Sequence, residues 1–339
     1  MSEDEVTALP TPIQGDADWR SYRAFRLKNG VTCLAVHDKE SKTTGMSCLV
    51  NVGAAADPRE LSGLAHFCEH MCFLGSEKYP GENEYKRFLS NHGGRSNAST
   101  SMHVTNYKCE VLADHAEHAF DIFSNFFVAP LFTLSGTSRE VNAIDSENSK
   151  NLTNDSRRRL QILKALADPD HYYSKFSTGN AITLDTEKNL EWIREALLAF
   201  HRKHYQPPNM TVVLAGPQSL DTLQHWMVER YSKIPNRMNE EKKEKTEIEK
   251  LIDQAAFEAP PNSLEHPPPP FHSAFTPKQQ GGNWPFLLTT KPLKSMRKLV
   301  LLWPIPSNDN RQPDQSASNI LSHLLGHEGP GSVFAVLQD

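Results

Sequence analysis

The chain has 339 residues, with 36 lysines and arginines against 41 aspartates and glutamates, so its net charge is −5. This acidic balance excludes a general attraction to nucleic acid or to an anionic membrane surface, and no apolar run approaches the roughly eighteen residues of a membrane span. With 38% hydrophobic and 23% charged residues, the composition is that of a folded protein, and the length favours about two domains.

The cysteines and the N-terminus indicate where the protein is located. Five cysteines, odd in number and irregularly spaced, argue against a disulfide framework and for a reducing compartment. The first five residues are acidic and lack the basic and then apolar order of a secretory signal. We therefore expect a cytoplasmic protein that begins with an acidic, flexible tail over residues 1–20.

An alternation of predicted strands and helices follows the tail. It opens with a hairpin whose turn, Asn29-Gly30, suits positive φ angles. The predicted strands are 22–27, 31–36, 46–52, 95–101, 106–112 and 210–215. The predicted helices are 61–74, 82–91, 116–127, 138–151, 157–167, 190–204 and 219–231. Hairpins mixed with helices predict an α+β domain over residues 21–235.

The sequence changes character after this domain. Residues 240–250 mix both charge signs, and residues 260–285 are rich in proline, so we interpret 236–290 as a linker. A second unit begins at 291, with a predicted strand at 297–303, a helix at 315–325 and an apolar helical pattern after 331. One strand and one or two helices cannot close a core. We therefore expect 291–339 to be the truncated start of a second domain. A longer protein, with Asp339 as an artificial end of the sequence, is a further interpretation.

The sharpest chemical signal is the sequence HFCEH at residues 66–70, inside predicted helix 61–74. On a helix, His70 lies about 40° from His66 and one turn along, so both imidazoles can reach one cation. Glu69 lies on the same side. Imidazole and carboxylate together suit zinc, and the order H-x-x-E-H is the inverzincin signature. The alternative is a helix with two surface histidines and a solvated glutamate.

A catalytic zinc needs a third protein ligand and leaves a fourth position for water. Predicted helix 138–151 offers Glu140 and Glu147, which are seven residues apart and therefore within about 20° of each other on the helix. Both can face the helix of the two histidines, whereas Asp145 lies well off that line. Each glutamate taken alone is equally typical of a solvated helix carboxylate.

The two histidines and the two glutamates belong to a longer series of motifs in a fixed order. From about residue 22 to residue 339 the sequence resembles the pitrilysin family of zinc endopeptidases, most closely the branch of insulin-degrading enzyme and nardilysin. The motifs that carry this resemblance are residues 66–75, 78–80, 82–85, 96–98, 105–107, 139–147, 175–180 and 327–332.

The resemblance implies a particular fold and metal site. The fold is a mixed, largely antiparallel sheet packed against helices, followed by an incomplete second domain of similar type that binds no zinc. One Zn²⁺ per chain is bound by His66, His70 and Glu147. Glu69 is the general base that takes a proton from the attacking water, and Glu140 is an acidic residue that supports the site.

The resemblance also implies how peptide substrates bind. A substrate adds as an extra strand along residues 95–101, where Asn97 and Ala98 match the family positions whose backbone pairs with it. From the residues alone, an ordinary edge strand blunted by polar side chains is the favoured interpretation of this segment.

Two hypotheses about function follow. Members of this branch close two halves around the peptide, and the C-terminal half supplies an arginine and a tyrosine to which no residue of this chain corresponds. The first hypothesis is a zinc endopeptidase of the insulin-degrading type that is incomplete without such a C-terminal half or a second copy of the chain, a homo-oligomer. The alternative is a catalytically silent, truncated paralogue that acts as a zinc-binding or peptide-binding scaffold.

Overall fold

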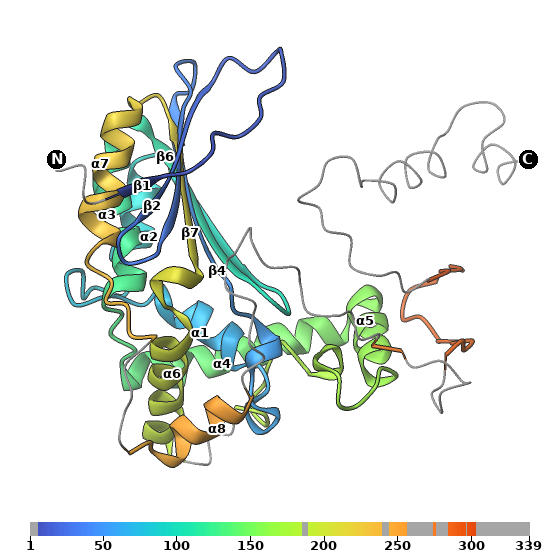
Figure 1. Ribbon diagram of the computed structural model, residues 1–339. Coiled ribbons are helices and arrows are strands. Elements are labelled where there is room, and N and C mark those ends of the chain that lie inside the picture. Colours follow the sequence, from blue (N-terminus) through green and yellow to red (C-terminus); the bar gives the residue numbers. More distant parts are fainter. Residues whose placement is uncertain are drawn as a thin grey trace, which may run out of the picture.

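The computed structural model describes residues 6–184, 189–238, 244–255, 274–275, 284–295 and 297–302. Its centre is a 7-stranded sheet with the order β1-β2-β3-β7-β4-β6-β5 (Figure 1). Neighbouring strands run antiparallel except β3 and β7, which run parallel. The predicted mixed, largely antiparallel sheet is confirmed. The strands are β1 (Val6–Ala8), β2 (Ser21–Leu27), β3 (Thr32–His37), β4 (Thr43–Val50), β5 (Arg95–Thr100), β6 (Thr105–Leu112) and β7 (Met210–Gly216).

Helices cover one face of this sheet. The packed helices include α3 and α7, which lie against the sheet in Figure 1, while α1 packs on β5 and β6 and also against α4 and α6. No helix in the described part of the chain is both long and apolar enough to cross a membrane. The helices are α1 (Leu64–Cys72), α2 (Glu84–Asn91), α3 (Ala116–Val128), α4 (Leu134–Leu152), α5 (Asp155–Ala165), α6 (Leu190–His204), α7 (Leu220–Tyr231) and α8 (Glu247–Ala255).

The two faces of the central strands differ in burial. In β4, Met46, Cys48 and Val50 are buried while the residues between them are half-buried, and β7 follows the same alternation. Because successive side chains of a strand point to opposite faces, the buried set forms the floor of the core beneath the helices. The aromatic stripe of α3 fills that core with Phe120, Phe123, Phe126 and Phe127.

Two helices that carry the site begin at positions other than those predicted. Helix α1 begins at Leu64 rather than at 61, because Gly63 has φ +98° and a short 3₁₀ turn, Arg59–Leu61, precedes it. Helix α4 begins at Leu134, four residues earlier than predicted, because the Thr133 hydroxyl accepts a hydrogen bond from the Gly136 N–H at 3.1 Å.

Two segments predicted to lack packed structure contain ordered elements. Within the predicted tail, Val6–Ala8 forms β1 and pairs with β2. Within the predicted linker, α8 buries Ile248 and Ile252 against α6. The apolar spacing of α8 lies inside a charged run, which is why composition alone indicated a linker. The domain boundaries themselves stay a prediction.

The strand predicted at 297–303 is wrong over its described part. Residues 297–302 form no strand, and Leu299 and Leu301 are exposed by 79% and 63%. A strand needs a neighbouring backbone for its hydrogen bonds, and no described segment pairs with this one. The predicted helix at 315–325 and the helical pattern after 331 lie outside the described residues.

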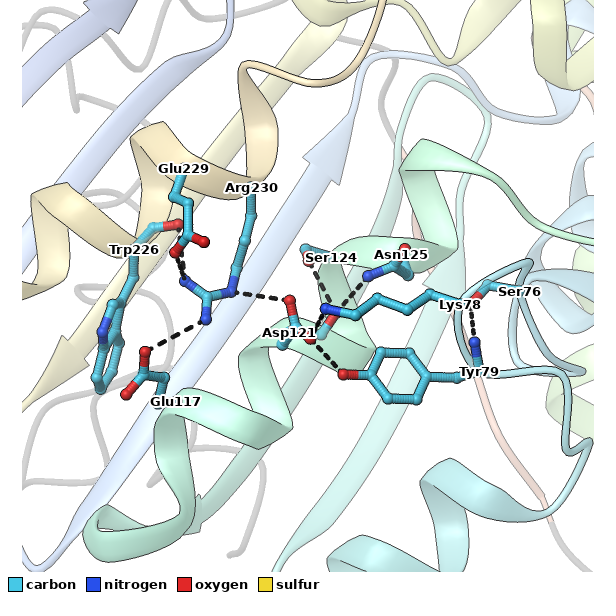
Figure 2. Close-up of polar contacts among 10 residues, drawn as sticks. All are labelled: Ser76, Lys78, Tyr79, Glu117, Asp121, Ser124, Asn125, Trp226, Glu229 and Arg230. Carbon is cyan, nitrogen blue, oxygen red and sulfur yellow. Dashed lines mark hydrogen bonds and ion pairs between the residues drawn. The ribbon is translucent and has the colours of Figure 1, made fainter.

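A buried ion-pair network ties the loop after α1 to the helical layer (Figure 2). Arg230 of α7 is only 6% exposed, and its Nε lies 3.3 Å from Oδ1 of Asp121 on α3. The other oxygen of Asp121 accepts hydrogen bonds from the Tyr79 hydroxyl and the Lys78 ammonium. A buried guanidinium is costly unless it is paired, so this network holds the chain at the C-terminal end of α1 against α3 and α7.

The burial of His204 on α6 makes the fold sensitive to acid. Burial lowers the pKa of this histidine to about 3, from its ordinary value of 6.5. Its contribution to stability is therefore fully present above pH 6.5 and is lost as the pH falls toward 3, because the unfolded chain binds the proton first. We expect a loss of about 2 kcal/mol between pH 7.5 and pH 5 from this group alone.

Chemical denaturation across this pH range checks the expectation. His204→Phe should have a flatter dependence of the unfolding free energy on pH than the unaltered protein. His225→Phe, a substitution at an exposed position of α7, should not change the slope. Parallel curves for His204→Phe and the unaltered chain would contradict the assignment.

Candidate metal centre

The packing of α1 against α4 brings three potential ligands together. His66 and His70 lie on one face of α1, and Glu147 reaches them from α4. Nε2 of His66 and Nε2 of His70 lie 3.6 Å and 3.8 Å from Oε2 of Glu147. The three ligand atoms all lie within 4.8 Å of one another. The structure therefore joins two residues predicted from one helix to a third predicted from another.

The spacing and chemistry of this set fit zinc. Ligands at about 2.0–2.1 Å from a tetrahedral ion are about 3.4 Å apart, close to the two distances from Glu147. Two imidazoles and one carboxylate are a donor set found in catalytic zinc sites, where the fourth position is left to water. The side chains of His66, His70 and Glu147 are exposed by 13%, 25% and 44%, so the site opens to solvent.

Hydrogen bonds from behind orient both imidazoles. Nδ1 of His66 lies 2.7 Å from the Thr178 carbonyl oxygen, and Nδ1 of His70 lies 2.9 Å from Oε2 of Glu140. A carbonyl and an ionised carboxylate can only accept, so each Nδ1 carries the proton and donates it. Each Nε2 is then left with its lone pair directed at the shared point, which is the form that binds a metal.

Glu140 and Glu147 lie on one face of α4 but make different contacts. Glu140 contacts His70 and lies outside the ligand cluster, while Glu147 supplies a ligand oxygen. Burial lowers the pKa of His70, but the hydrogen bond to Glu140 and the nearby carboxylates raise it by more, so the net shift is upward. Asp145 points elsewhere, where it accepts a hydrogen bond from the Ala181 N–H at 2.9 Å.

Glu69 is held beside the ligands and is only 6% exposed. Its Oε2 accepts a hydrogen bond from the Thr100 hydroxyl of β5. Burial raises the pKa of Glu69, although Thr100 and the two histidines oppose the shift. A buried carboxylate with a raised pKa is a stronger base than one in water.

The predicted substrate positions lie on the edge strand next to this glutamate. Among the described residues, β5 pairs with β6 only, with Asn97 opposite Lys108 and Ala98 opposite Tyr107. The outer edge of β5 thus offers backbone groups to a further strand. Thr100, which donates the hydrogen bond to Glu69, lies two residues beyond Ala98 on the same face of the strand.

Sequence reasoning missed two members of the site, the Thr100 hydroxyl and the Thr178 carbonyl. The second of these was the harder to find. A backbone oxygen has no side-chain signature, and Thr178 lies 112 positions from His66 in the chain. The signal that could have found it is the motif at residues 175–180, which the resemblance included without a role.

Comparisons with known proteins match the chain to a peptidase family. The family model "Insulinase (Peptidase family M16)" matches residues 32–170, and "Peptidase M16 inactive domain" matches residues 191–339. The human insulin-degrading enzyme is 40% identical over 323 residues, which are 95% of this chain and 29% of that protein. The A-factor-processing enzyme of Saccharomyces cerevisiae (strain ATCC 204508 / S288c) is 38% identical over 328 residues, 96% of this chain and 29% of that enzyme.

Solved structures share the fold. The crystal structure of pitrilysin superposes with a TM-score of 0.66 at 34% sequence identity, covering 71% of this chain and 26% of that one. A protease from Helicobacter pylori superposes with a TM-score of 0.59 at 20% identity, covering 67% of this chain and 53% of that one, and shows the fold alone.

The fold and the His-His-Glu cluster are thus those of an inverzincin-type metallopeptidase domain. The two family matches together take in most of the chain. The chain belongs to the insulinase, or pitrilysin-type, family of metallopeptidases (M16). It spans less than a third of the length of the curated relatives that it matches.

Zinc binding tests the three ligands directly. We expect about one zinc per purified chain, and His66→Ala should abolish it. Glu140→Gln should keep the stoichiometry but weaken zinc affinity by about 10–100-fold, because the partner that orients His70 is lost. Glu191→Gln, at an exposed position of α6, serves as the matched control. Equal zinc content in His66→Ala and the unaltered chain would end the metal assignment.

Proposed function

We propose that this chain is the zinc-bearing part of an endopeptidase of the insulin-degrading type. The observation that carries the proposal is the convergence of His66, His70 and Glu147 within 4.8 Å beside the buried Glu69. Such a set holds one Zn²⁺ and leaves a position for water. The metal would polarise the peptide carbonyl and lower the pKa of water.

The residues around the ligands have separate tasks in this proposal. Glu69 accepts the proton of the attacking water and afterwards delivers it to the leaving nitrogen. The Thr100 hydroxyl orients its carboxylate. Glu140 fixes His70 so that Nε2 stays directed at the ion.

We propose peptides as the substrate class. The relatives are named for degrading insulin and for processing A-factor. The free edge of β5 at Asn97 and Ala98 can take an extended peptide as an added strand, which gives affinity through main-chain hydrogen bonds with little dependence on sequence. Thr100 on the same strand places that peptide next to Glu69.

Completion of the active site is a further part of the proposal. The relatives are more than three times as long as the matched segment. We propose that cleavage needs a complementing C-terminal half or a second copy of the chain. We propose the cytoplasm as the place of this activity. The alternative is a catalytically silent scaffold that binds zinc or peptides.

Substitution of Glu69 separates these two functions. We expect Glu69→Gln to retain zinc while cleavage of a quenched fluorescent peptide, measured with an added C-terminal half from a relative, falls about 10²–10⁴-fold because the proton acceptor is lost. Glu77→Gln, at an exposed position just after α1, should cleave normally. Bound zinc without any cleavage by the complemented, unaltered chain would favour the scaffold.

Strand addition predicts a periodic response to backbone methylation of the peptide. Every second N–H of an added strand points at β5, so N-methylation should weaken cleavage at alternate positions. We expect losses of about tenfold or more at those positions, since each methyl removes a hydrogen bond and adds a clash. A loss that is uniform along the peptide, or confined to the scissile bond, would contradict strand addition at Asn97 and Ala98.

A further inference from the structure

The segment 175–179 lies directly against the N-terminal end of α1. Gly63 and Gly179 have φ +98° and +79°, and a Cβ on Gly63 would lie 2.3 Å from Cα of Gly179. The two backbones therefore touch without side chains between them. This approach brings the Thr178 carbonyl to 2.7 Å from Nδ1 of His66.

A buried lysine holds this segment from the other side. Lys164 of α5 is 4% exposed. Its ammonium donates to the Lys175 carbonyl at 3.1 Å and to Oγ of Ser177 at 2.8 Å. Both acceptors lie within three residues of Thr178, so Lys164 fixes the course of the backbone that faces His66.

A second lysine ties the same segment to the loop before α1. The ammonium of Lys175 donates to the carbonyl oxygens of Ala55 and Asp57 at 2.6 Å and 2.8 Å. The fully buried Asp57 carboxylate in turn accepts from the N–H groups of Gly63 and Ala65, each at 2.8 Å. The start of α1 and the segment 175–179 are thus held in one polar network.

The buried position of Lys164 disfavours its charged form. Burial lowers the pKa of this lysine, and only the charge of the nearby Asp57 opposes the shift. A buried ammonium bound mainly by neutral acceptors adds little to folding stability, and an apolar side chain of similar size is often tolerated there. Its effect on the position of the Thr178 carbonyl is a role that an apolar side chain would not fill.

We propose that Lys164 is a positioning residue for the metal ligand His66, acting through Lys175, Ser177 and the Thr178 carbonyl. The inference rests on the proposed function in that His66 binds zinc. With the ammonium in place the carbonyl accepts the Nδ1 proton, and Nε2 faces Glu147 and His70. Without it the segment relaxes away from α1, and the imidazole loses the acceptor that fixes its tautomer and direction.

The test compares zinc affinity with stability in the full chain. For Lys164→Met we expect zinc to bind about tenfold more weakly in a chelator competition, near the lower end of what loss of an orienting partner costs. The visible spectrum of the Co²⁺-substituted protein should change as well. The melting temperature of the metal-free protein should stay within a few degrees of the unaltered one, which a purely structural role would not allow.

Two further variants complete the design. Lys203→Met removes a lysine of α6 that pairs with Asp253 at 2.7 Å, away from the ligands, and should leave zinc affinity and the cobalt spectrum unchanged. Ser177→Ala removes one acceptor of Lys164 with little change of volume. It should weaken zinc about two- to threefold, and it decides the question if Lys164→Met does not fold.

The outcomes separate the inference from the proposed function. The inference alone is overturned if the unaltered chain binds zinc and Lys164→Met has the same zinc affinity and the same cobalt spectrum. If Lys164→Met does not fold, the same result in Ser177→Ala overturns it. The inference is also overturned if the variant binds zinc more weakly only to the extent that its metal-free form is less stable. No zinc binding by the unaltered chain would overturn the proposed metal site and the inference with it.

Discussion

The contact between α1 and α4 is the constraint on which the site depends. Neither helix can form the cluster alone, because α1 supplies two imidazoles on one face and, in the part of the chain that the structure describes, α4 supplies the only carboxylate that reaches both of them. The sheet sets where α1 lies, since this helix packs on β5 and β6 as well as on α4. At its far end, the loop that follows α1 is fastened to Asp121 and Arg230 (Figure 2).

The carboxylates at the site give the cluster its preference for a cation. Glu69, Glu140 and Glu147 gather around two histidines, and their combined charge raises the pKa of His70 despite its burial. A divalent ion would replace the protons that this arrangement otherwise attracts, so metal binding and proton release are linked. Each imidazole has a hydrogen-bond partner behind it, which keeps its Nε2 directed at the shared point.

The sequence predicted the site residues that share one face of a helix. The remaining parts of the site come from other segments of the chain, and helical spacing does not predict them. His66, His70, Glu140 and Glu147 were accessible because spacing on a helix determines which side chains share a face. The Thr178 carbonyl and the buried Lys164 depend on contacts between distant segments and, for the carbonyl, on a backbone atom. The strand expected at 297–303 shows the opposite error, since an apolar β-prone run cannot supply its own hydrogen-bonding neighbour.

The hydrogen bond between Thr100 and Glu69 joins the two halves of the proposed chemistry. Thr100 belongs to the edge strand on which a peptide would add, and Glu69 belongs to the helix that carries the ligands. A peptide that pairs with β5 therefore pairs with the strand that also holds the base. Because β5 is anchored to the sheet only through β6 among the described strands, its contact with α1 is what keeps the edge in register with the ligands. Binding of the substrate backbone and placement of the proton acceptor then depend on the same piece of structure.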